Sequence, residues 1–220
     1  MEKSQKHSTI EVKITGLGSF TVNKGVTLGD VSRIAQQQWP YLIVGGIIKN
    51  VLRDLEYVLE DACEVELVDT SSDNGLRIYN RSLTFLLIKA CHDLYPEKKI
   101  MIKHTLGNGL YCEFTNSECT EGEIEKISRR MREIVAADLP LTRKLLSKAE
   151  ACELLLRQNQ EDTVKLLQYR DKVNVHVNQL DGFYEYFYGY MVNRTGMLDR
   201  FRLIHYPPGM VLQTPSQEDQ

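Results

Sequence analysis

The chain has 220 residues and a mass of 25.3 kDa, which is enough for one large domain or two small ones. Its composition, 42% hydrophobic and 26% charged, is that of an ordinary globular protein, so wholesale disorder is excluded. With 27 basic and 30 acidic residues the net charge is -3, so binding of nucleic acid would need a local basic patch rather than a general positive field.

The sequence shows no membrane segment and no disulfide framework. No apolar run approaches the roughly 20 residues that span a bilayer, and the first residues contain no hydrophobic signal core. The 5 cysteines are an odd number at scattered positions, which is typical of reduced thiols that pack in a core. We therefore expect a cytoplasmic protein that has no membrane partner.

The first part of the chain predicts strands and one helix. Alternating apolar residues on both sides of Gly16-Leu17-Gly18 predict a β-hairpin over residues 10–22. Thr27 is expected to cap a helix that ends at Trp39-Pro40. The apolar face of that helix comprises Leu28, Val31, Ile34 and Ala35.

Further strands are predicted over residues 42–48 and 63–67. Strands with one covering helix make a small α+β domain, which we assign to residues 1–69. The polar sequence DTSSDNG that follows is the expected boundary, so residues 70–77 are predicted to be a linker.

Residues 78–212 predict a second α+β domain, and residues 213–220 a polar tail. A helix is expected from Ser82 to Pro96, followed by a hairpin around Gly107-Asn108-Gly109. Two capping boxes, Thr120 with Glu123 and Ser147 with Glu150, predict the starts of two more helices. The remainder is expected to be mostly strand.

An aromatic block covers Phe183 to Tyr190. If it is a strand, Phe183, Glu185 and Phe187 face one way, because side chains alternate. The opposite face then carries Tyr184, Tyr186, Tyr188 and Tyr190. Either both faces pack between a sheet and a helix, or the four phenols form a stacking surface for a base or nucleoside.

Basic residues occur near the same helix and in the later segments. They are Arg77, Arg81, Lys89, Arg170, Lys172, Arg194, Arg200 and Arg202. They either form a phosphate or RNA-backbone site or belong to an ordinary solvated surface.

These patterns resemble known proteins. Residues 8–69, with the strings TLGDV and WPYLIVGGIIKN, resemble a TGS domain, the ubiquitin-like β-grasp module of threonyl-tRNA synthetases. Residues 78–205 resemble the second domain of the same enzymes, through the turn at 107–111 and the helix segment 128–131. The resemblance implies a β-grasp domain followed by an α+β domain similar to the synthetase editing domain.

In the synthetases the second domain hydrolyses mischarged Ser-tRNA through an HxxxH and a distal CxxxH motif. By resemblance, the corresponding positions here are Phe85, Lys89, Phe187 and Met191. None of these side chains is a zinc ligand or general base, and no other histidine has HxxxH spacing to a ligand. We therefore expect no catalytic residue and no metal. One alternative is a deacylase that uses substrate-assisted chemistry or a base such as His104 or His176, and another is a protein-interaction module.

A more specific resemblance is to the amino-terminal half of bacterial uridine kinase-like proteins. It is carried by residues 73–87, 166–171, 182–192 and 206–209. A kinase needs a phosphate-binding GxxxxGK[ST] loop, which this chain lacks, so ATP and Mg are expected only for an attached kinase domain.

The predicted function is therefore a non-catalytic accessory region that binds a nucleotide or tRNA-like ligand. The candidate cleft comprises Arg77, Arg81, Phe85, Lys89, Tyr184, Tyr186, Phe187, Tyr188, Tyr190 and Met191.

Overall fold

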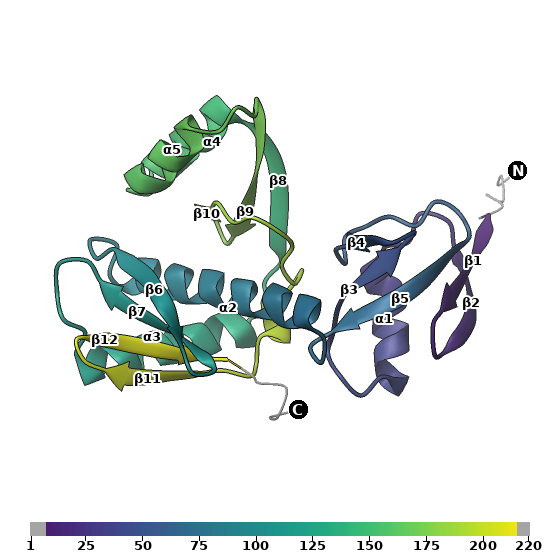
Figure 1. Ribbon diagram of the computed structural model, residues 1–220, viewed down its shortest axis with the longest axis horizontal. Coiled ribbons are helices and arrows are strands. Elements are labelled where there is room, and N and C mark those ends of the chain that lie inside the picture. The colour runs from purple at the N-terminus through teal and green to yellow at the C-terminus, as the bar shows by residue number, and fades with distance from the viewer. Residues whose placement is uncertain (1–7, 215–220) are drawn as a thin grey trace, which may run out of the picture. The chain divides into compact units, whose positions relative to one another are not determined.

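The computed structural model describes residues 8–214, which form two compact units (Figure 1). Within these residues, the first unit comprises 8–79 and 190–193, and the second comprises 80–189 and 194–214. Both units combine helices with sheets, so the predicted α+β class is confirmed. No helix in this part of the chain is long and apolar enough to cross a lipid bilayer.

The first unit is a five-stranded sheet with one α-helix. Its elements are β1 (Thr9–Ile14), β2 (Gly18–Asn23), α1 (Leu28–Ala35), the 3₁₀ turn η1 (Gln36–Gln38), β3 (Ile43–Ile48), β4 (Val51–Arg53) and β5 (Cys63–Asp69). The strand order is β2-β1-β5-β3-β4, in which β1 and β5 are parallel and the other neighbours antiparallel. The assignment of this unit to the TGS family stays a prediction.

Helix α1 begins where the sequence predicts it. The Thr27 hydroxyl accepts a hydrogen bond from the Asp30 amide at 3.1 Å, and the Asp30 carboxylate accepts one from the Thr27 amide at 3.0 Å. This reciprocal pair satisfies two amides that the first helical turn leaves open. Leu28, Val31 and Ala35 are buried, but Ile34 is 47% exposed, so its assignment to the apolar face was wrong.

The second unit contains more helix than the sequence predicts. Its elements are most of α2 (Asp73–Leu94), β6 (Ile100–Leu106), β7 (Gly109–Phe114), α3 (Glu121–Ala136), β8 (Leu141–Ser147), α4 (Lys148–Leu156), α5 (Glu161–Gln168), β9 (Asn174–Leu180), β10 (Phe183–Glu185), the 3₁₀ turn η2 (Thr195–Met197), β11 (Arg202–Tyr206) and β12 (Gly209–Gln213). They form a four-stranded sheet, β11-β12-β7-β6, and a three-stranded sheet, β10-β9-β8.

Helix α2 begins inside the expected linker. The Ser72 hydroxyl accepts a hydrogen bond from the Gly75 amide at 3.2 Å, so the polar segment starts a helix and does not form a loop. A side chain at position 75 would meet the Asp69 carbonyl oxygen at 1.7 Å, which explains the glycine. Residues 73–77 are thus helical, contrary to prediction, and the division between the two units falls within α2 after Tyr79.

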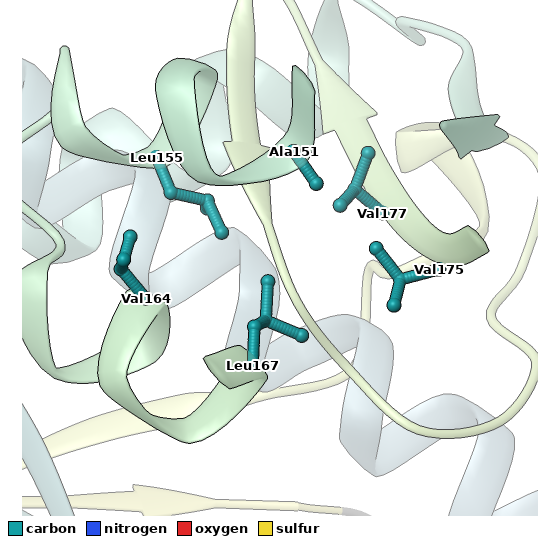
Figure 2. Packing of buried hydrophobic residues seen from close by; sticks show 6 residues of the cluster. All are labelled: Ala151, Leu155, Val164, Leu167, Val175 and Val177. Atoms are coloured by element: carbon teal, nitrogen blue, oxygen red, sulfur yellow. The ribbon is translucent and has the colours of Figure 1, made fainter. Parts of the chain in front are cut away.

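Helices α4 and α5 pack with β9 around a hydrophobic cluster of their own (Figure 2). The cluster comprises Ala151, Leu155, Val164, Leu167, Val175 and Val177. The expectation that the remainder of the chain is mostly strand is wrong for residues 161–168, because these residues form α5. The capping boxes at Thr120 and Ser147 are confirmed. Of the predicted tail, Gln213 ends β12 and residues 215–220 lie outside the described residues.

The cysteines are free thiols, as expected. Cys91, Cys112 and Cys119 are buried. Burial raises the pKa of Cys112 to about 12 and that of Cys119 to about 11, so both thiols are protonated at neutral pH and pack as small apolar groups.

Candidate functional site

Helix α2 places Phe85 and Lys89 one turn apart in the interior of the second unit. Phe85 is fully buried, and its ring lies 6.0 Å from the ring of Phe183 and 5.9 Å from that of Phe187, measured between centroids. The structure thus brings together two positions, 85 and 187, that the resemblance places at one centre. Phenyl rings contain no acid, base or metal-ligand atom, so this cluster contributes packing.

Lys89 is 6% exposed and belongs to a buried ion network. Its Nζ atom lies 2.6 Å from Asp93 Oδ1 and 3.7 Å from Asp181 Oδ2. The other Asp93 oxygen accepts hydrogen bonds from Arg130 Nε at 2.9 Å and from Arg130 Nη2 at 2.7 Å. Asp93 therefore bridges two cations, and the Lys89 ammonium is held by carboxylates.

The two arginines of the candidate cleft belong to different units. Arg77 is exposed and lies in the first unit, whereas Arg81 is half-buried in the second. A side chain at Gly189 would meet the Arg81 guanidinium at 2.8 Å, so the loop that follows the aromatic block passes directly over this group. Arg81 therefore contacts this loop, and Arg77 lies one turn before it on α2. Their assignment to a ligand-binding cleft stays a prediction.

The aromatic block is not one strand. Strand β10 ends at Glu185, because only Phe183, Tyr184 and Glu185 pair with β9. The predicted face of four tyrosines is thus wrong, since alternation stops where pairing stops. Tyr188 is 77% exposed, and Tyr190 and Met191 belong to the first unit.

Tyr184 and Tyr186 pack at the edge of the α4–α5 cluster. Each has a cation over its ring: Lys144 Nζ lies 5.5 Å from the Tyr184 centroid, and Arg170 Cζ lies 5.7 Å from the Tyr186 centroid. The structure therefore combines partly buried phenols with positive charge on this part of the second unit. Binding of a ligand by these tyrosines stays a prediction.

The two histidines that were weighed as bases lie on strands. His104 on β6 is exposed and packs against Tyr111, with 5.2 Å between ring centroids, and His176 on β9 is exposed. Within residues 8–214, no three His, Cys, Asp or Glu side chains are grouped so that they could hold a metal ion.

A pocket of about 380 Å³ lies in the second unit, next to the phenylalanine cluster. It is lined by the second half of α2, the start of β6, the α4–α5 connection, α5 and β10. The lining residues are Ile88, Cys91, His92, Pro96, Glu97, Lys98, Lys99, Ile100, Gln158, Asn159, Gln160, Glu161, Thr163, Phe183 and Glu185. The volume suits a small organic molecule.

Among the titratable side chains that line this pocket, Glu185 and His92 have pKa values shifted by burial toward neutral pH or below it. Burial raises the pKa of Glu185 to about 7, although the Tyr186 amide, the Thr163 hydroxyl and Lys99 all favour its ionised form. Burial also lowers the pKa of His92, whose ring lies 4.7 Å from the ring of Phe183. At neutral pH the pocket therefore contains a neutral imidazole and a partly protonated carboxyl group.

Sequence reasoning missed this pocket. His92 was interpreted as a lone histidine, although it lies one turn after Lys89 on the same helix. Glu185 is the one carboxylate within the aromatic block, and this isolated acidic residue was the signal in the sequence that could have indicated the pocket. The pocket walls come from segments more than 50 residues apart in sequence, so local patterns could not bring them together.

No protein-family model matches the chain. The proteins to which it is similar are aminoacyl-tRNA ligases, and they are specific for threonine. They include threonine–tRNA ligases of Francisella tularensis subsp. novicida (26% identical over 180 residues), Thermotoga maritima (27% over 199) and Ligilactobacillus salivarius (28% over 200).

These matches cover 81%, 89% and 90% of this chain but 28%, 30% and 31% of the relatives. The chain thus spans less than a third of the length of the ligases that it matches. The similarity supports the relation to threonyl-tRNA synthetases. It gives no support to a nucleoside kinase parent, which stays a prediction.

Proposed function

We propose that this chain is a tRNA-binding region related to threonine–tRNA ligases and that it has no hydrolytic centre of its own. The similarity to those ligases covers up to 90% of the chain, so it reaches into both units, and this observation carries the proposal. The buried Phe85 and the ion-paired Lys89 support the second half of it, because neither side chain can activate a water.

The two tyrosines that have a cation over the ring, Tyr184 and Tyr186, favour the second unit as the RNA-binding part. Partly exposed aromatic rings stack on unpaired bases, and lysine or arginine neutralises phosphates. Tyr184 with Lys144 and Tyr186 with Arg170 combine both kinds of group. On a chain with net charge -3, such a local combination is what RNA binding requires.

Binding of fluorescently labelled threonine tRNA, followed by anisotropy at low and moderate KCl, tests the proposal. We expect saturable binding that weakens at least tenfold between about 50 and 200 mM salt, because counterion release is lost. Uridine nucleotides serve as competitors that distinguish a nucleotide site from an RNA site. No binding at low salt would overturn the proposal.

A matched pair of variants locates the surface. Arg170→Ala with Lys172→Ala removes two charges from unit 2, and Lys13→Ala with Arg33→Ala removes two from unit 1. We expect the first pair alone to weaken tRNA binding severalfold. Equal weakening by both pairs would indicate a general charge effect and would contradict a surface in unit 2.

The similarity to ligases also favours a second candidate, an editing deacylase. Here the base would be a residue such as His104 or His176, or a group of the substrate itself. Release of serine from Ser-tRNA above that of heat-inactivated protein, and its loss in one of the two His→Ala variants, would establish this activity and replace the non-catalytic proposal.

The attached kinase is a separate proposal. It rests on the strings of residues 73–87, 166–171, 182–192 and 206–209 and not on the matched relatives. ATP and Mg would act only in that domain. A GxxxxGK[ST] motif in the reading frame beyond Gln220 would support it, and a ligase domain there would contradict it.

A further inference from the structure

The pocket between α2, β6 and the α4–α5 connection has one apolar wall. Ile88, Ile100 and Phe183 line it with an aliphatic and aromatic surface. The ring of Phe183 is held in place by Phe85 and His92, so the wall is formed in the absence of a ligand. An apolar part of a small molecule can pack there.

The lysines that line the pocket have ion-pair partners, but the glutamates that line it have none among the described residues. Lys98 is paired with Glu123 and Lys99 with Asp162, and neither of these carboxylates lines the pocket. Glu97, Glu161 and Glu185 line it, and no cation of residues 8–214 lies within ion-pair distance of them. The uncompensated charge that faces the pocket is therefore negative, which favours a positively charged ligand.

Two glutamines of the polar lining, Gln158 and Gln160, have fixed orientations. Gln160 Nε2 donates to the Tyr184 carbonyl at 2.7 Å, which fixes the orientation of the amide. Gln160 Oε1 is buried and receives no hydrogen bond from any described residue. Gln158, in contrast, accepts from the Tyr184 amide at 2.9 Å and donates to the Gly182 carbonyl at 3.0 Å. Both glutamine amides are therefore held in place by backbone groups of residues 182–184.

We infer that this pocket binds a small primary amine with an apolar body: the ammonium group pairs with Glu185, and the body packs on Ile88 and Phe183. An ammonium group supplies both a positive charge and three hydrogen-bond donors. The site is independent of the proposed tRNA surface, because it needs no phosphate or base.

Glu185 provides a second signature of such a ligand. The groups that face it are the Tyr186 amide, the Thr163 hydroxyl of α5 and Lys99 of the segment before β6, and His92 of α2, Glu97 and Glu161 line the same pocket. Its pKa is raised to about 7 by burial. A bound ammonium group stabilises the carboxylate, so binding releases a proton below pH 7 and becomes tighter between pH 6 and pH 8.

Titration of the full chain with benzylamine, benzyl alcohol and benzoate, followed by two-dimensional NMR, tests the inference. We expect benzylamine to shift amide signals of residues 88–100 and 158–185, at an affinity at least tenfold higher than that of the neutral alcohol. Glu185→Gln should weaken benzylamine at least tenfold and abolish the pH dependence. Glu125→Gln, on the exposed face of α3, is the matched control and should bind as wild type.

Three results would overturn the inference. They are benzyl alcohol or benzoate binding as tightly as the amine, equal loss in both Glu→Gln variants, and signal shifts confined to other parts of the chain. Methylammonium provides an independent readout, because without an apolar body it should bind at least tenfold more weakly than benzylamine. None of these titrations contains RNA, so their failure leaves the proposed tRNA binding untouched.

Discussion

At the scale of single residues, Asp93 links the interior of the second unit. One oxygen of its carboxylate accepts a hydrogen bond from Lys89 on the same helix, and the other accepts hydrogen bonds from Arg130 on α3. Its side chain is 17% exposed and that of Lys89 is 7% exposed, so little water is available to replace a lost partner. Removal of one member of such a network leaves uncompensated charge.

We therefore expect Asp93→Ala to lower the free energy of unfolding by about 2 to 4 kcal/mol, because two cations lose their carboxylate in a largely buried place. Urea denaturation followed by circular dichroism measures the change. Glu133→Ala removes the other carboxylate bound by Arg130, at 3.3 Å, but that side chain is 55% exposed. It should cost less than about 0.5 kcal/mol, and equal costs would contradict the role of burial.

Glu185 leads to a prediction about pH. Its folded pKa of about 7 exceeds its usual value of 4.5, so the folded chain binds this proton more tightly than the unfolded chain. The proton's contribution is full below pH 4.5 and is lost as the pH rises to about 7. Relative to wild type, Glu185→Gln should gain stability on the order of 1 to 3 kcal/mol between pH 4.5 and 8. Urea midpoints across this range measure it, and parallel curves for both proteins would contradict the burial of this carboxyl.

Little of the candidate site was predictable residue by residue. The contact of Phe85 with Phe187 followed from the resemblance, because it places both at one centre. The tyrosine face was wrong, because strand pairing ends at Glu185 and sequence alternation cannot show where pairing ends. The ion network of Asp93 was missed, since its arginine lies 37 residues away on another helix.

At the scale of elements, three of the four predicted helices have explicit start signals, whereas α2 was predicted from its apolar spacing alone and α5 was missed. Helices α1, α3 and α4 each begin with a reciprocal capping box, which is written in the sequence as Thr or Ser with an acidic residue three positions later. Helix α5 follows Gln160, whose side chain makes no cap hydrogen bond. Its apolar face is recognisable only once α4 and β9 cover it (Figure 2).

Helix α5 should therefore depend on packing more than on its own sequence. We expect Leu167→Ala to cost about 2 to 5 kcal/mol, because Leu167 is fully buried in the cluster of Figure 2 and its truncation leaves a cavity. The neighbouring Leu166→Ala is the control, since Leu166 is 51% exposed, and should cost less than about 1 kcal/mol. Denaturant unfolding compares the two, and similar costs would show that α5 is not packed as described.

At the scale of the whole molecule, the chain forms two compact units that are not contiguous in sequence. Residues 190–193 belong to the first unit, although the residues on both sides of them in the sequence belong to the second. There Asn193 Nδ2 donates to Glu56 Oε1 at 2.8 Å, and Val192 is fully buried. The first unit is therefore complete only when a segment more than 100 residues downstream is present.

Val192 is thus a fully buried residue that is assigned to the first unit. The single tryptophan, Trp39, also lies in the first unit, where its Nε1 donates a hydrogen bond to Asp69 at 2.6 Å. The fluorescence of Trp39 therefore reports on unfolding of the first unit. We expect Val192→Ala to lower the free energy of unfolding seen by Trp39 by about 1 to 3 kcal/mol. Val51→Ala, at a position 46% exposed, should change it by less than about 0.5 kcal/mol. An unchanged Trp39 transition in Val192→Ala would contradict the assignment.

The phenylalanine cluster around α2 also limits how this chain can change over evolutionary time. A Phe85→His change would place an imidazole between two phenyl rings at a fully buried position, and Lys89→His would remove the ammonium group from Asp93. Each substitution loses stability before a second or third has supplied any catalytic gain. Packing and ion pairing at these two positions therefore disfavour stepwise replacement by imidazoles.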